Sequence, residues 1–135
     1  CAFVDGAIEP GVLILQSGTY DMEGWVAWVR EGAPGGDAAL AQAILANQDR
    51  ESGLGHDALQ ARSGTRHAGR GACDVLLVQG RSDPQSRPDD VEHMASALRE
   101  AGRRVEMAVA ADGAHRLPPS LATDALERHW PGLAF

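Results

Sequence analysis

The chain has 135 residues, about the length of one domain, and 44% of them are hydrophobic, an ordinary fraction for a globular protein. The net charge is −7, and all 12 basic residues are arginine. Nucleic acids and anionic membranes are bound by clustered basic faces, so this composition argues against both as partners. The sequence also lacks an apolar run of the roughly 18 residues that a membrane span needs.

The cysteines and the first residues bear on the origin of the chain. Cys1 and Cys73 are the only cysteines, and two cysteines do not make a disulfide framework. The compartment therefore stays open, although this cysteine content fits a reducing cytoplasm. The sequence begins with Cys1 rather than Met, and a strand-like segment begins already at Gly11. We therefore expect it to be a piece of a longer protein, either processed or cut.

Three short apolar runs are the candidate strands. Residues 11–16 (GVLILQ) lie between Pro-Gly and Ser-Gly pairs, and residues 74–79 (DVLLVQ) end at a glycine. Continuous apolar runs of this length are typical of strands buried on both faces of a parallel sheet, although periodicity alone does not exclude a buried helical turn. Residues 105–109 (VEMAV) form a third, more amphipathic run, as expected nearer the edge of a sheet.

A helix is predicted between the second and third runs. In the segment RPDDVEHMASALREAG, apolar residues recur at the spacing of one helix face, at Val91, Met94, Ala95 and Leu98. Acidic residues precede this face, and Gly102 follows it as a stop signal. Strand, helix and strand joined by short turns make a βαβ unit, so the two strands are expected to be parallel.

The remaining segments complete an α/β pattern. Helices are predicted at residues 38–47 and 120–129, and residues 53–72, rich in Gly, Arg and Ser, are predicted to form a loop with one short turn. The order is then β, α, long loop, β, α, β, α, which is typical of an α/β fold with a mostly parallel sheet. Three strands are few for such a sheet, so we expect further strands from elsewhere.

Two polar residues follow neighbouring strands, at the ends where α/β sheets bind their ligands. Asp83 closes the segment Gly-Arg-Ser-Asp after the second strand, and His115 closes Asp-Gly-Ala-His after the third. Singly, such an Asp is more often a turn or cap residue, and a loop His is more often only exposed. Together, a carboxylate can accept the Nδ1 proton of the imidazole and orient the ring as a base. The joint arrangement favours a catalytic acid–base pair.

The segment DVLLVQGRSDPQSRPDDVEHMASALREAGRRVEMAVAADGAHRL resembles the last third of an α/β-hydrolase. In that superfamily a strand ends in a Gly-x-x-Asp segment that carries the acid, and the last strand leads to the loop with the catalytic histidine. Asp83 and His115 match those positions. The resemblance is greatest to the prolyl-oligopeptidase and acylaminoacyl-peptidase group and to related esterases, where GVLILQSGTYDM and ARSGTRHAGRGACDVLLVQG also have counterparts. It implies a three-layer α/β/α fold, a catalytic triad and no cofactor.

The sequence departs from the family pattern at three places. Gln79 stands where a His before the glycine is frequent, and Ala114 stands where the family often has Gly. The nucleophile elbow Gly-x-Ser-x-Gly is missing, because no serine here has glycines two positions before and after it. The family order is nucleophile, acid, base. The resemblance therefore implies a nucleophile and oxyanion-hole amides upstream of Gly11.

Other residues carry weaker arguments. Ser17 follows the first strand, where the family places a structural serine, and Cys1 could act as an N-terminal nucleophile if processing exposes it. Tyr20, Trp25 and Trp28 could line a substrate pocket or carry a lid, although plain hydrophobic contacts explain them more simply. No metal site is predicted, because metal-ligand spacing is missing at the other histidines, which are His56, His67, His93 and His129.

The sequence thus predicts the C-terminal segment of one α/β-hydrolase domain over residues 1–135. The predicted function is hydrolysis of a small-molecule ester, amide or peptide substrate. Asp83 and His115 would act from this chain, and the nucleophile from the upstream half, present as a separate or cleaved chain. Alone, the chain is expected to be inactive. Two alternatives remain: a non-catalytic remnant of the fold that binds a partner or ligand, and an enzyme with Cys1 as its nucleophile.

Overall fold

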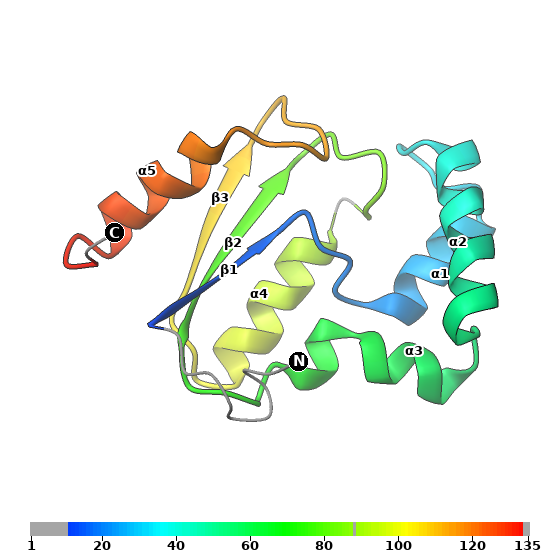
Figure 1. The fold of residues 1–135 in the computed structure, drawn as a ribbon, viewed down its shortest axis with the longest axis horizontal. Helices are drawn as coiled ribbons and strands as arrows, with labels where there is room; N and C mark the ends of the chain where they lie inside the picture. Colours follow the sequence, from blue (N-terminus) through cyan, green and yellow to red (C-terminus); the bar gives the residue numbers. More distant parts are fainter. Residues whose placement is uncertain (1–10, 88, 134–135) are drawn as a thin grey trace.

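A three-stranded parallel sheet organises the computed structural model, which describes residues 11–87 and 89–133 (Figure 1). The strands are β1 (Val12–Gln16), β2 (Asp74–Gly80) and β3 (Val105–Ala110), in the order β1-β2-β3. In this register Leu77 of β2 pairs with Leu15 on one side and with Met107 on the other. The predicted α/β class, the three strands and their parallel direction are confirmed, and β3 lies at an edge of the described sheet.

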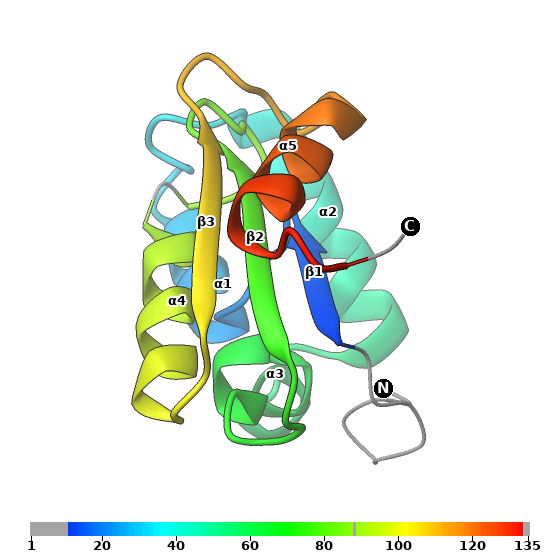
Figure 2. The same ribbon diagram turned by 90° about the vertical axis from the view of Figure 1, so that its left-hand side faces the viewer.

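One helix packs on each face of β2 and β3 (Figure 2). Successive strand residues point to opposite faces, so Val75 and Leu77 belong to one hydrophobic cluster, and Leu76 and Val78 to another. Helix α4 (Asp90–Glu100) packs against the first cluster, and helix α5 (Pro119–His129) against the second. Both helices agree with the sequence prediction. β2 is buried on both faces, as its continuous apolar run predicts.

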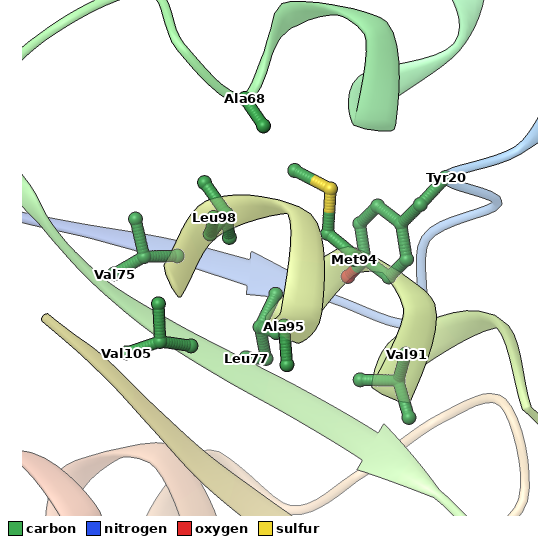
Figure 3. Packing of buried hydrophobic residues seen from close by; sticks show 9 residues of the cluster. All are labelled: Tyr20, Ala68, Val75, Leu77, Val91, Met94, Ala95, Leu98 and Val105. Carbon is green, nitrogen blue, oxygen red and sulfur yellow. The ribbon is translucent and has the colours of Figure 1, made fainter. Parts of the chain in front are cut away.

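The predicted apolar face of α4 packs against the sheet in one hydrophobic cluster (Figure 3). All four apolar residues that define this face are at most 5% exposed. They meet side chains from β2, from β3 and from the segments that flank the sheet, and the full cluster is Tyr20, Ala68, Val75, Leu77, Val91, Met94, Ala95, Leu98 and Val105. Spacing along the sequence therefore identified the buried side of α4 correctly.

A group of helices with its own core connects β1 to β2. It consists of α1 (Met22–Arg30), α2 (Ala38–Ser52), α3 (His56–Arg62) and the short 3-10 helix η1 (Gly64–His67). The prediction of a loop with one short turn over residues 53–72 is wrong, because α3 and η1 occupy much of it. Only Leu59 of α3 is buried, so the segment carries no periodic apolar pattern. No helix in the described ranges is long and apolar enough to span a membrane.

The sequence prediction also missed α1 and ended α2 too early, at residue 47. The side-chain carboxylate of Asp21 caps α1 by accepting a hydrogen bond from the backbone N of Gly24, at 3.1 Å. Valine, tryptophan and glycine all have modest or low helix propensity, so packing rather than propensity stabilises α1. α2 continues to Ser52 through a polar stretch, where helix-favouring Gln and Arg need no apolar pattern.

A buried carboxylate ties the segment after β1 to α4. Asp90 is 1% exposed, and it accepts hydrogen bonds from the backbone N of Tyr20, at 2.7 Å, and of Asp21, at 3.2 Å. Burial raises the pKa of Asp90, and the backbone hydrogen bonds and the nearby Arg87 guanidinium oppose this only in part. This anchor fixes the path of the chain between the sheet and α1.

Candidate active site

The ends of β2 and β3 approach each other very closely. A Cβ atom at Gly80 would lie only 2.2 Å from the carbonyl oxygen of Gly113, so a side chain is not tolerated there. The backbone N of Arg81 donates to the carbonyl of Ala110 at 2.9 Å, and that of Ser82 donates to the carbonyl of Gly113 at 3.0 Å. The two loops after the strands are thereby held side by side, which brings their polar residues together.

Asp83 and His115 are in direct contact at this end of the sheet. Nδ1 of His115 lies 3.0 Å from Oδ2 of Asp83. The side chain of Asp83 is 2% exposed, whereas that of His115 is 38% exposed. The carboxylate is therefore shielded from water while the imidazole remains accessible. Since Nδ1 is the ring nitrogen that faces the carboxylate, the proton belongs on Nδ1, and Nε2 is the nitrogen that can act as a base.

The backbone of His115 is held from β1. The hydroxyl of Ser17, which directly follows β1, donates to the carbonyl of His115 at 2.8 Å. The hydroxyl proton of Ser17 is thus engaged with a backbone carbonyl and not with the imidazole. This contact makes Ser17 a structural serine in this fold, in line with its position in the resemblance.

The carboxylate of Asp83 has two further donors. The side-chain amide Nε2 of Gln79 lies 3.1 Å from Oδ2, and the backbone N of Gln85 lies 2.9 Å from Oδ1. The sequence identifies Gln79 only as a departure from the family pattern. A residue at the end of β2 that reaches forward to the acid was not identified there, because its strand position does not reveal where its side chain points.

The three aromatic candidates lie in different surroundings. Trp25 and Trp28 are 2% and 7% exposed and belong to the core of helices α1–α3. The indole nitrogen of Trp25 donates to the carbonyl of Gln85 at 2.9 Å, and Trp25 thereby braces the loop that carries the carboxylate. Tyr20 instead lines a cavity beside β1.

This cavity has a volume of about 640 Å³ and lies on the α4 side of the sheet. Its walls are mainly apolar and include Leu13 and Leu15 of β1, with Cys73 and three arginines among the other residues around it. The hydroxyl of Tyr20 is buried and has no hydrogen-bond partner among the described residues. Burial raises the pKa of Tyr20 to about 12. The face of β1 toward α4 is therefore only partly covered.

The histidines that the sequence analysis set aside do not contact Asp83 or His115 where the structure describes them, and Cys1 lies outside the described residues. Three histidines contact acidic side chains elsewhere on the molecule, in the pairs His56–Glu23, His93–Asp89 and His129–Glu106. Over residues 11–87 and 89–133, no group of three or more His, Cys, Asp or Glu side chains could hold a metal ion.

The fold resembles parts of larger peptidases of known structure. A puromycin-hydrolyzing peptidase from Mycobacterium tuberculosis matches 93% of this chain and 18% of its own, with a TM-score of 0.66 and 24% identity. An acylaminoacyl peptidase from Pyrococcus horikoshii matches 84% of this chain and 17% of its own, with a TM-score of 0.61 and 16% identity. An acylaminoacyl peptidase in complex with Z-Gly-Gly-Phe-chloromethyl ketone also matches 84% of this chain and 17% of its own, with a TM-score of 0.59 and 18% identity. Neither a protein-family model nor a curated protein matches the sequence.

These matches confirm the predicted resemblance at the level of the fold. The chain has the fold of part of an α/β-hydrolase, and it spans less than a fifth of the length of the peptidases that it matches. One fold can serve many functions, and at these identities the likeness shows the fold alone. What the chain does must therefore be argued from its own side chains.

Proposed function

We propose that this chain carries the acid and the base of a serine-type hydrolase. The observation that carries the proposal is the 3.0 Å contact between Nδ1 of His115 and Oδ2 of Asp83, at the ends of adjacent parallel strands. The shielded carboxylate and the accessible imidazole suit the two roles. The similar structures are named as peptidases, which favours peptide or amide bonds over esters as the substrate.

In the proposed mechanism His115 is the general base. Its Nε2 takes the hydroxyl proton of a nucleophilic serine as the serine oxygen attacks the substrate carbonyl, and it then gives that proton to the leaving group. Water cleaves the resulting acyl-enzyme: Nε2 takes a proton from the attacking water and returns it to the serine oxygen. Asp83 holds the tautomer that leaves Nε2 unprotonated, and its charge stabilises the imidazolium.

The nucleophile and the oxyanion-hole amides belong, in this proposal, to the upstream half of the same hydrolase domain, on the same polypeptide or as a cleaved chain. β1 offers the place for that half. Its sequence VLILQ is apolar on both faces, yet Ile14 is 42% exposed and β1 lies at an edge of the described sheet. A parallel strand beside β1 would pair with its outer backbone groups. A helix after that strand would fill the cavity beside Leu13 and Leu15.

The test is labelling with a fluorophosphonate probe, which reacts with activated serines, followed by intact mass spectrometry under denaturing conditions. We expect a labelled serine on the upstream half, whether on the same polypeptide or on a second one. His115→Ala is expected to slow labelling roughly 10²- to 10⁴-fold, the usual contribution of a general base. His93→Ala is the matched control, because His93 is 55% exposed on α4 and contacts Asp89 rather than Asp83.

Other outcomes would support the two alternatives. If the label or an alkylating agent modifies Cys1 and activity is lost with it, the enzyme uses a processed N-terminal nucleophile. If nothing is labelled in purified material that contains the upstream half, the chain belongs to a non-catalytic remnant of the fold. Equal labelling rates in His115→Ala and His93→Ala would remove His115 from the mechanism.

A further inference from the structure

We propose that Gln79 is a positioning residue for the acid of this site. Its side-chain amide holds the carboxylate of Asp83 in the orientation that receives the imidazole of His115. This inference rests on the proposed function and adds a residue that its mechanism does not use. It concerns the position, at the end of β2, where the sequence departs from the family resemblance.

The geometry around the carboxylate is asymmetric. Nε2 of Gln79 and Nδ1 of His115 approach the same oxygen, Oδ2, at 3.1 Å and 3.0 Å. The backbone N of Gln85 donates to the other oxygen, Oδ1, at 2.9 Å. Turning the plane of the carboxylate about the Cβ–Cγ bond, away from the observed angle, would break the bond to Gln79. The amide of Gln79 therefore holds this plane at the angle at which one of the two equivalent oxygens faces the imidazole.

The orientation of the Gln79 amide follows from its neighbours. If its nitrogen and oxygen were exchanged, Oε1 would lie 3.1 Å from a carboxylate oxygen, which would bring two acceptors together. In the orientation observed, Nε2 also donates to the hydroxyl of Ser86 at 2.9 Å. Nε2 also lies 3.3 Å from the carbonyl oxygen of Gly80, which is the longest of its three contacts. The two amide hydrogens thus serve mainly Asp83 and Ser86.

Packing alone does not account for an amide at this position. Gln79 is 5% exposed, and its Oε1 has no hydrogen-bond partner among the described residues. A buried carbonyl without a partner destabilises a fold, whereas a methionine would fill the same space without that loss. The hydrogen bond to a charged carboxylate is the stronger kind and offsets the loss. The amide is therefore explained by what it does to Asp83.

The experiment observes the Nδ1 proton of His115 by NMR in the 135-residue chain with ¹⁵N-labelled histidine. While it is bonded to the carboxylate, this proton is expected to resonate far downfield and to exchange slowly with water. Gln79→Met keeps the length of the side chain and removes the donor. It is expected to speed the exchange of the Nδ1 proton roughly tenfold, because the loss of one hydrogen bond to a charged group changes an equilibrium by about that factor. Gln79→Glu is nearly isosteric but places an acceptor against Oδ2, so its effect should be at least as large.

Ser86→Ala is the matched control. It removes the nearest partner of the Gln79 amide, the Ser86 hydroxyl at 2.9 Å, and leaves all three donors to Asp83 in place, so the exchange rate is expected to stay at the wild-type value. Unchanged exchange in both Gln79 variants would overturn the proposal. An equal acceleration in Ser86→Ala would also overturn it, because Gln79 would then act only as a tether of the loop. These readouts need no nucleophile, so they are independent of the labelling test of the proposed function.

Discussion

β1 and β2 are neighbours with similar apolar sequences, but only β2 is buried. β1 consists of VLILQ and β2 of DVLLVQG. Leu15 of β1 stands beside Leu77 of β2, and Leu77 is fully buried whereas Leu15 is only half-buried. Ile14 is 42% exposed, and its neighbour Leu76 is fully buried. β1 thus has the sequence of an inner strand and, within the described sheet, the position of an edge strand.

The difference in burial between β1 and β2 divides the sheet into a region that helices cover and a region that they leave partly open. β2 and β3 lie between α4 and α5 (Figure 2). The loops that follow these two strands carry the pair of Asp83 and His115. β1 borders the cavity instead, and its outer edge pairs with no other described strand. The acid and the base are therefore on the covered side, and the open side is where the proposed upstream half would add.

The largest expected effect comes from truncating the same residue type in the two strands. Leu77→Ala removes a fully buried side chain and is expected to lower the free energy of unfolding by about 2–5 kcal/mol. Leu15→Ala, at the paired position in β1, is expected to cost roughly 1 kcal/mol, because its side chain is already partly in water. Urea unfolding of the isolated chain measures both. Equal losses would mean that β1 is covered in solution, for example by a second copy of the chain.

Most of the sheet could be predicted from the sequence because its strands are short and mainly apolar runs, of which β2 ends at Gly80 and β1 is followed by a Ser-Gly pair. α4 was equally accessible, since its buried residues recur at helix spacing on an otherwise polar segment. The same spacing of apolar residues occurs in α1, at Met22, Trp25, Val26 and Val29. The glycine, valines and tryptophans of this segment have poor helix propensity, which argues against a helix when the sequence is considered alone. α3 buries only Leu59, so tertiary contacts decide its conformation and the sequence pattern does not.

The positions of the candidate pair could be predicted because both residues directly follow strands, where backbone direction alone brings them together. The role of Gln79 could not. As a strand residue its side chain belongs to one face of the sheet, and only the turn at the end of β2 brings Asp83 back within 3.1 Å of its amide. The orientation of a side chain at a strand end depends on that turn, which a single sequence does not specify.

Substitution of Asp90 tests how much the anchor of the segment after β1 contributes to stability. It accepts the backbone N–H groups of Tyr20 and Asp21 and is 1% exposed. Asp90→Ala deprives both groups of that partner and is expected to lower the free energy of unfolding by about 1–3 kcal/mol. Asp90→Asn keeps an acceptor oxygen and is the matched variant for the pH dependence. Chemical denaturation over a pH series compares it with the wild type.

The sign of the pH dependence follows from the raised pKa of Asp90. Because burial favours the neutral carboxyl group, the stabilisation by Asp90 is complete below its ordinary pKa of 3.8 and is lost as the pH rises through the raised value in the fold. The wild type is therefore expected to lose stability relative to Asp90→Asn across that window. A change in the opposite direction would show that the hydrogen bonds from Tyr20 and Asp21 outweigh burial.

Ile14 is expected to give the smallest effect on the chain itself and the sharpest test of the open edge. Ile14 and Leu40 are the exposed large hydrophobic residues of the described chain, at 42% and 37%. Ile14→Lys and Leu40→Lys should each change the free energy of unfolding by less than about 0.5 kcal/mol, because both side chains already meet water.

The two variants should differ once the proposed upstream half is present. A strand beside β1 would cover Ile14, and a lysine there would place a charge in an apolar contact, whereas Leu40 lies on helix α2 and not on a strand of the sheet. Where the upstream half is a separate or cleaved chain, size-exclusion chromatography and intact mass spectrometry of the purified assembly should show it retained by Leu40→Lys and released by Ile14→Lys. Retention by both would mean that the upstream half binds elsewhere. The apolar sequence of β1 would then need another explanation, and the most direct one is pairing of its edge with a second copy of the chain.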